Sequence, residues 1–163
     1  MSFIFGFGKA NMVLAGQMRG AADYATWKRC RSIGFKWGLG LSVASFIILY
    51  AARVPIFSVY SQDAQALALS ETVMFWVAAV CIPQGHTIIT AGILRGSGQT
   101  TAVAVYSFVL ITVLRPLMTA FFIYYCKLGI VGAWVPMFLD QSLRSLCFTW
   151  KVMRIRGLKD LIK

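Results

Sequence analysis

The sequence predicts an all-α fold, a polytopic bundle of about four full transmembrane helices with a shorter partial helix at the N-terminus. Three observations predict it. Apolar residues make up 59% of the 163 positions, whereas a soluble domain is typically about 45–50% apolar. Charged residues make up 13%, about half the usual quarter. Most lysines and arginines lie at the ends of long apolar stretches, as in proteins whose main solvent is lipid.

The apolar stretches can be followed in order along the chain. A helix needs about 20 apolar residues to cross the hydrocarbon core of a bilayer. The stretch 3–18 is shorter, so we expect a truncated or interfacial helix there. The stretches that are long enough to cross span residues 37–60, 72–94, 101–126 and 128–150. The whole chain, 1–163, is therefore predicted to be a single transmembrane region.

The basic residues predict the orientation of these spans. The connection 19–36 and the tail 151–163 each carry five lysines or arginines, whereas the connection 58–70 carries none. Cytoplasmic segments of membrane proteins carry the excess of positive charge. We therefore expect a multi-pass protein of the cell membrane in which segment 19–36, Arg95 and the basic tail 151–163 are cytoplasmic. The tail also has the composition of a helix that lies against anionic headgroups.

Pairs of glycines four residues apart recur in the predicted helices, namely Gly16 with Gly20, Gly34 with Gly38, and Gly92 with Gly96. Small residues at this spacing let two helix backbones approach closely in lipid. Glycine is also simply frequent in membrane helices. The sequence supports both interpretations equally.

The most polar part of the span 72–94 begins at Pro83, which breaks the ladder of backbone hydrogen bonds. It contains the single histidine of the chain, His86, together with Gln84, Thr87 and Thr90. Ionisable groups at membrane depth usually face a bundle interior or a water-filled cavity. We interpret this segment as a candidate wall of a polar cavity. The alternative is that His86 only hydrogen-bonds a neighbouring helix for structure.

Charged residues also lie within the last two predicted spans. Asp140 and Arg144 are four residues apart, so on a helix they share one face and can neutralise each other. We predict a structural ion pair, and the functional alternative makes Asp140 a proton-binding or cation-binding group. Arg115 directly precedes Pro116, where it can anchor a broken helix or face a substrate path.

Several classes of function are not supported. The net charge of +11 could indicate nucleic acid, but the basic residues are not interleaved along an exposed face, so we expect no nucleic-acid partner. One histidine, with four cysteines that form no CxxC pair, argues against a metal site, and we expect no cofactor. Segment 96–100 lacks the lysine of a P-loop, and we predict no catalytic residues and no enzymatic activity.

Several motifs recur in a recognisable order. The first loop, 13–23, contains Gly16, Gln17, Gly20 and Asp23, and the second, 91–100, contains Leu94, Arg95, Gly96 and Gly98. The sequences at 114–117 and 128–134, and Asp140 with Arg144, follow at matching spacing. Together they resemble the multidrug and toxic compound extrusion (MATE) transporters.

The resemblance covers about residues 6–156 and implies the C-terminal lobe of a family whose fold has two six-helix lobes. It implies that this chain holds a partial lobe, and that its partner is a missing N-terminal lobe. One branch of the family carries an acidic residue for cation coupling in the tenth helix. Gln84 stands at that position here, and a neutral amide cannot exchange a proton, so coupling there is not expected.

The resemblance further implies a function. It implies that the chain is part of a secondary active multidrug efflux antiporter. Such an antiporter exports cationic or amphipathic compounds, small organic cations or drugs, in exchange for H+ or Na+ by alternating access. We expect this chain to supply one cavity wall and to be inactive as an isolated fragment; the lining candidates are Gln84, His86, Thr87, Thr90 and Arg115. The alternatives are a small non-transporting membrane protein for assembly or interaction, and a fragment of a related flippase of lipid-linked substrates.

Overall fold

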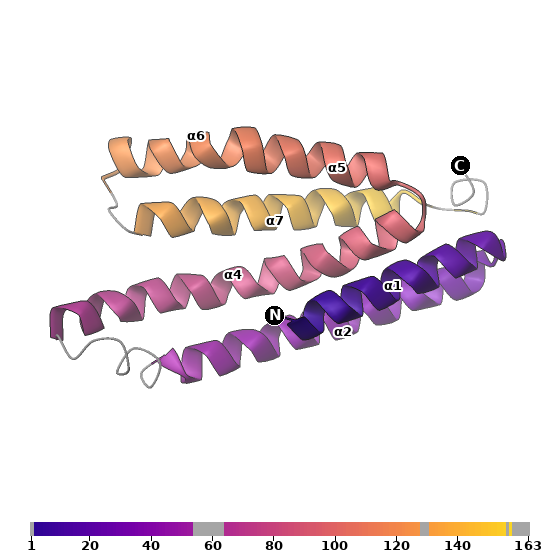
Figure 1. Cartoon of the computed structure of the whole chain (residues 1–163), viewed down its shortest axis with the longest axis horizontal. Helices are drawn as coiled ribbons and strands as arrows, with labels where there is room; N and C mark the ends of the chain where they lie inside the picture. The colour runs from indigo at the N-terminus through magenta and orange to yellow at the C-terminus, as the bar shows by residue number, and fades with distance from the viewer. Residues whose placement is uncertain (1, 54–63, 128–130, 156, 158–163) are drawn as a thin grey trace.

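The computed structural model describes residues 2–53, 64–127, 131–155 and 157 (Figure 1). This part of the chain is helical and contains no strand, which confirms the predicted all-α fold. Its helices are α1 (Ser2–Gly20), α2 (Tyr24–Ala51), α4 (Ala64–Gly96), α5 (Thr100–Phe108), α6 (Arg115–Ala120) and α7 (Val131–Met153). Two π-helical segments, Val109–Leu114 and Phe121–Tyr125, make α5 and α6 parts of one long helix.

Within the described residues, three helical segments are long and apolar enough to cross a membrane, namely Tyr24–Ala51, Thr72–Gly96 and Thr100–Tyr125. The predicted span 128–150 corresponds to α7, which has 23 residues and is therefore about 34 Å long. Asp140, Gln141 and Arg144 lower the hydropathy of α7, so this helix is long enough to cross but is not among the three apolar segments. A membrane crossing by α7 stays a prediction. The predicted short helix 3–18 corresponds to α1, which runs alongside only part of α2 and α4 (Figure 1).

The helices alternate in direction, so α1, α4 and α7 run one way while α2 and the long helix 100–125 run the other (Figure 1). The turn after α1, the turn after α4 and the last turn of α7 therefore meet at one end of the bundle. Two hydrogen bonds join them there: Trp27 Nε1 donates to Ser97 Oγ at 3.0 Å, and the Tyr24 hydroxyl donates to the Ile155 carbonyl at 3.1 Å. The described basic segments thus lie at a common end, and the side of the membrane that this end faces stays a prediction. Residues 156 and 158–163 of the predicted tail lie outside the described part of the chain.

The predicted connection 19–36 is mostly helical, which corrects the expectation of a loop there. Helix α2 begins at Tyr24 rather than residue 37, so Lys28 and Lys36 lie on a helix and not in a connection. Asp23 caps this helix, because its carboxylate accepts the backbone N–H of Thr26 at 3.0 Å. Lysine and arginine are good helix formers, so a basic segment can continue a membrane helix beyond the bilayer. The predicted end of the first full span, at residue 60, lies outside the described residues.

Pro83 does not interrupt α4, which continues from Ala64 to Gly96. The predicted break in the backbone hydrogen bonds therefore amounts to the one N–H that Pro83 lacks. The side chain of Thr87 donates to the Pro83 carbonyl at 2.7 Å and so adds a hydrogen bond within this turn. The polar residues that follow Pro83 consequently keep a helical arrangement.

Close packing against neighbouring helices explains two of the three glycine pairs. A Cβ at Gly92 would collide with the Gly8 carbonyl oxygen of α1, and a Cβ at Gly96 would collide with the Met12 carbonyl oxygen. On α2, Gly34 and Gly38 similarly make room for side chains of the neighbouring helices. By contrast, nothing lies within 4 Å of a Cβ placed at Gly20. The glycines of α4 thus set the short distance between α1 and α4.

Trp27→Phe should lower the free energy of unfolding by about 1 kcal/mol, because it removes the buried hydrogen bond to Ser97 while keeping most of the apolar volume. Trp37→Phe is the matched control, since Trp37 is 61% exposed within the protein. Thermal unfolding in one detergent compares the two variants. Equal losses of stability would show that the hydrogen bond contributes nothing.

Candidate functional site

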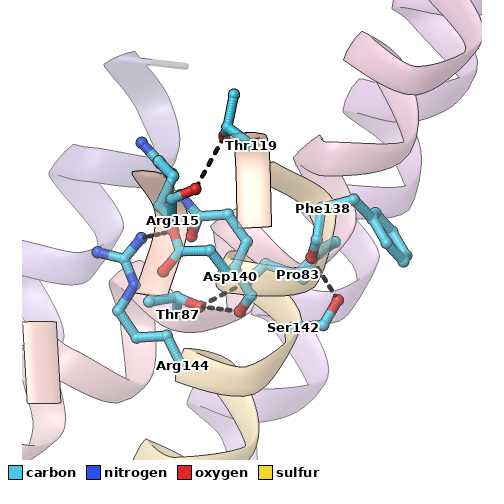
Figure 2. A network of polar contacts seen from close by, with 9 residues as sticks. Pro83, Thr87, Arg115, Thr119, Phe138, Asp140, Ser142 and Arg144 are labelled. Carbon is cyan, nitrogen blue, oxygen red and sulfur yellow. Dashed lines mark hydrogen bonds and ion pairs between the residues drawn. The ribbon is translucent and has the colours of Figure 1, made fainter. Parts of the chain in front are cut away.

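The strongest polar feature inside the bundle is an ion network of three side chains (Figure 2). Arg115 Nη2 lies 2.6 Å from Asp140 Oδ2, and Arg144 Nη2 lies 2.9 Å from the same oxygen. The Asp140 side chain is completely buried, whereas the Arg115 side chain keeps 31% of its exposure. The predicted ion pair of Asp140 with Arg144 is therefore present, and Arg115 extends it to a second helix.

The π-helical segment before Arg115 helps to place its side chain. Pro116, the second residue of α6, has no backbone N–H, and a wider helical turn precedes it. In that turn the backbone N–H of Arg115 donates to the Leu110 carbonyl, five residues back. The wider turn changes the face on which α6 continues, and Arg115 meets Asp140 of α7. Arg115, a predicted cavity-lining residue, has a buried carboxylate as its observed partner.

The network is incomplete. Asp140 Oδ1, Arg115 Nε and Arg144 Nε are buried and have no hydrogen-bond partner within the described residues. A buried polar atom without a partner typically costs about 1–3 kcal/mol. The two arginines and one aspartate also leave the network with one net positive charge. Within this part of the chain, the network thus has two unpartnered donor atoms, one unpartnered acceptor atom and one net positive charge.

Two polar contacts connect α4 to α7 beside this network. The Thr87 hydroxyl lies 3.3 Å from the Gln141 carbonyl oxygen, and His86 Nδ1 lies 2.8 Å from Ser145 Oγ. Thr90 is fully buried, and its hydroxyl donates to the His86 carbonyl at 2.7 Å. These contacts hold the polar segment of α4 against α7.

An apolar cavity of about 650 Å³ lies between α2, α4 and α7. His86 and Ser145 contribute polar atoms to it, and most of its remaining wall is apolar, including the aromatic residues Phe46, Phe75 and Phe138. A mostly apolar lining with a few polar groups is typical of sites for small organic ligands. The cavity therefore suits an amphipathic compound better than a fully hydrated ion.

The five predicted lining residues do not share one cavity. His86 lines the apolar cavity, and Thr87 lines a smaller pocket on the side of α4 that faces α1. Thr90 is buried in a helix contact, Gln84 is partly exposed on α4, and Arg115 belongs to the ion network. The role of these residues in substrate binding remains a prediction.

Sequence reasoning missed part of the apolar cavity. Ser142, Ser145 and Thr149 all line it, and their spacing of three and four residues places them on one face of α7. This polar stripe is visible in the sequence and could have been found. The contribution of α2 could not, because it depends on how α2 packs against α4.

The two motif loops lie close together at one end of the bundle (Figure 1). Gly98 has a positive φ of 80°, and the backbone of this turn passes the side chain of Arg19. Asp23 is exposed, and hydrogen bonds from the side chain and backbone of Thr26 lower its pKa below the usual range of aspartate. Gly16, Gln17 and Gly20 end α1, while Leu94, Arg95 and Gly96 end α4.

Comparisons with known proteins point to one family. A family model described as MatE matches residues 1–121. A relative from Xanthomonas campestris pv. campestris, described as a probable multidrug resistance protein NorM, is 30% identical over 95 residues, which cover 58% of this chain and 21% of the relative. Proteins of the same description are similar in Chromobacterium violaceum, 23% identical over 87% of this chain and 31% of the relative, and in Thermotoga maritima, 24% identical over 86% and 30%. The chain thus spans between about a fifth and a third of the length of these relatives.

Proposed function

Because this chain belongs to the MatE family, that of the MATE transporters, we propose that it forms part of one lobe of a multidrug efflux transporter. The observation that carries the proposal is the family match over residues 1–121, which includes both motif loops. The helical bundle and its apolar spans support a multi-pass membrane protein.

The transport that we propose is antiport by alternating access. Cationic or amphipathic compounds leave in exchange for H+ or Na+, and two lobes rock about a site between them. This chain supplies one wall, and an N-terminal lobe, our proposed partner, supplies the other. The basic end of the bundle, with the C-terminus, faces the cytoplasm, where positive segments of membrane proteins collect.

The apolar cavity is our candidate for a substrate-contacting surface. Its aromatic walls can hold an apolar body, and His86 and Ser145 can orient a polar group. Asp140 is paired with two arginines, which favours a structural role over cation coupling. The ion network then keeps α6 and α7 together as one body during the rocking motion.

Efflux of a fluorescent cationic dye tests this proposal in an efflux-deficient bacterium. The chain alone should cause no efflux, since it lacks the opposing wall. Co-expression with the N-terminal part of the Chromobacterium violaceum relative should lower dye accumulation.

If the chain is inserted in the membrane but dye accumulation stays unchanged both with the chain alone and with co-expression, a small membrane protein for assembly or interaction is favoured instead. Export of a lipid-linked substrate without dye efflux would favour the flippase. Dye efflux by the chain alone would refute the need for a second lobe.

A further inference from the structure

A small pocket of about 200 Å³ lies between α1, α4, α5 and α7, and it differs in character from the apolar cavity. We define it as the basic pocket by its cationic lining residues Lys9, Arg95 and Arg144. No carboxylate lines it among the described residues. Its volume corresponds to roughly seven water molecules at about 30 Å³ each, enough for a small oxyanion.

The positive charge of the basic pocket is not neutralised by the described part of the chain. Arg144 shares Asp140 with Arg115, so the ion network keeps one net positive charge. Lys9 and Arg95 are both exposed, and the structure gives neither an ion pair with a described carboxylate. Charges of one sign around one pocket repel each other, and an anion between them would offset that repulsion.

Arg144 provides a second, independent indication of an anion. Arg144 is only 9% exposed, and its buried Nε atom has no hydrogen-bond partner among the described residues. Nη2 of the same guanidinium already donates to Asp140. Because Arg144 lines the pocket, an oxyanion there would place negative charge beside a largely buried cation, where charge-assisted contacts are strong.

The remaining walls indicate what carries the anion. Phe5, Ile88 and Phe148 line the same pocket and present apolar surface beside the cations. Lys9 follows Gly8, which packs against Gly92, and Arg95 lies one helical turn beyond Gly92 toward the basic end of the bundle. Arg95, the cation nearest that end, therefore lies where a headgroup phosphate can enter the pocket.

We propose that the basic pocket binds the phosphate group of an anionic amphiphile, with Lys9, Arg95 and Arg144 contacting the phosphate and Phe5, Ile88 and Phe148 contacting its apolar part. This chemistry has two sources, a phospholipid of the bilayer or a soluble alkyl phosphate. The proposal goes beyond the proposed export of cationic compounds, because it concerns an anion and a site that the chain holds by itself.

Native mass spectrometry of the full 163-residue chain tests the proposal. Two samples of the chain are prepared, one from nanodiscs of phosphatidylcholine with phosphatidic acid and one from nanodiscs of phosphatidylcholine alone. Dodecyl phosphate is added to the second sample. The wild-type chain should bind either phosphatidic acid or dodecyl phosphate. Lys9→Gln with Arg95→Gln should weaken binding about tenfold or more, the equivalent of about 1.4 kcal/mol or more.

Lys28→Gln with Lys36→Gln is the matched control, because it removes the same charge from exposed positions of α2. It should leave binding within about twofold, a difference well below the tenfold that 1.4 kcal/mol represents. Retention of phosphatidic acid identifies a bilayer lipid, and binding of dodecyl phosphate alone identifies a soluble ligand. Binding of neither, or equal loss in both double variants, overturns the proposal. Circular dichroism checks that all variants remain helical, and dye efflux is measured separately, so each proposal can fail alone.

Discussion

Asp140→Asn should destabilise the folded bundle by about 3–5 kcal/mol, the typical cost of removing one partner from a buried ion pair. The Asp140 side chain is completely buried and is the shared acceptor of Arg115 and Arg144. Asparagine has nearly the same size but no charge, so two arginines would remain near each other without a counter-charge. Thermal unfolding in detergent measures the loss, and a reduced monodisperse fraction in size-exclusion chromatography should accompany it.

Asp23→Asn is the matched control for this substitution. Asp23 is an exposed helix cap, and asparagine caps a helix about as well as aspartate, so the free energy of unfolding should change little. Replacing Arg115, Asp140 and Arg144 together by methionine, leucine and methionine should recover most of the lost stability, because no buried charge remains unpaired. If Asp140→Asn and Asp23→Asn were equally mild, the network would not stabilise the bundle.

The same network shows which parts of the site can be predicted from sequence. Asp140 and Arg144 are four residues apart on one helix, so their pairing is a local property and was predicted correctly. Arg115 joins them from another helix, after a π-helical segment whose wider turn decides which way it faces. Neither that turn nor the contact between α6 and α7 follows from spacing alone.

The fold shows a similar division. The apolar spans were predicted because hydropathy is read directly from consecutive residues. The start of α2 was placed too late, although Asp23 before Thr26 is a recognisable cap signal, because the basic residues were taken to mark a loop. The apolar cavity combines side chains of α2, α4 and α7, so it depends on tertiary packing.

The second large effect is expected at the contact between α1 and α4, where Gly92→Ala should cost about 1–3 kcal/mol. A Cβ at Gly92 would meet the backbone carbonyl of Gly8, and backbone atoms cannot rotate away as a flexible side chain can. Helix α1 must therefore move outward along its contact with α4. Thermal unfolding measures the loss.

Gly40→Ala is the control, because nothing lies within 4 Å of a Cβ at that position of α2. Alanine is a better helix former than glycine by about 1 kcal/mol, so Gly40→Ala should be neutral or stabilising. The same propensity gain applies to Gly92→Ala, and only the collision with α1 distinguishes the two. If both variants were stabilised alike, α1 would not pack against α4 through its backbone, and the basic pocket formed between these helices would lose its structural basis.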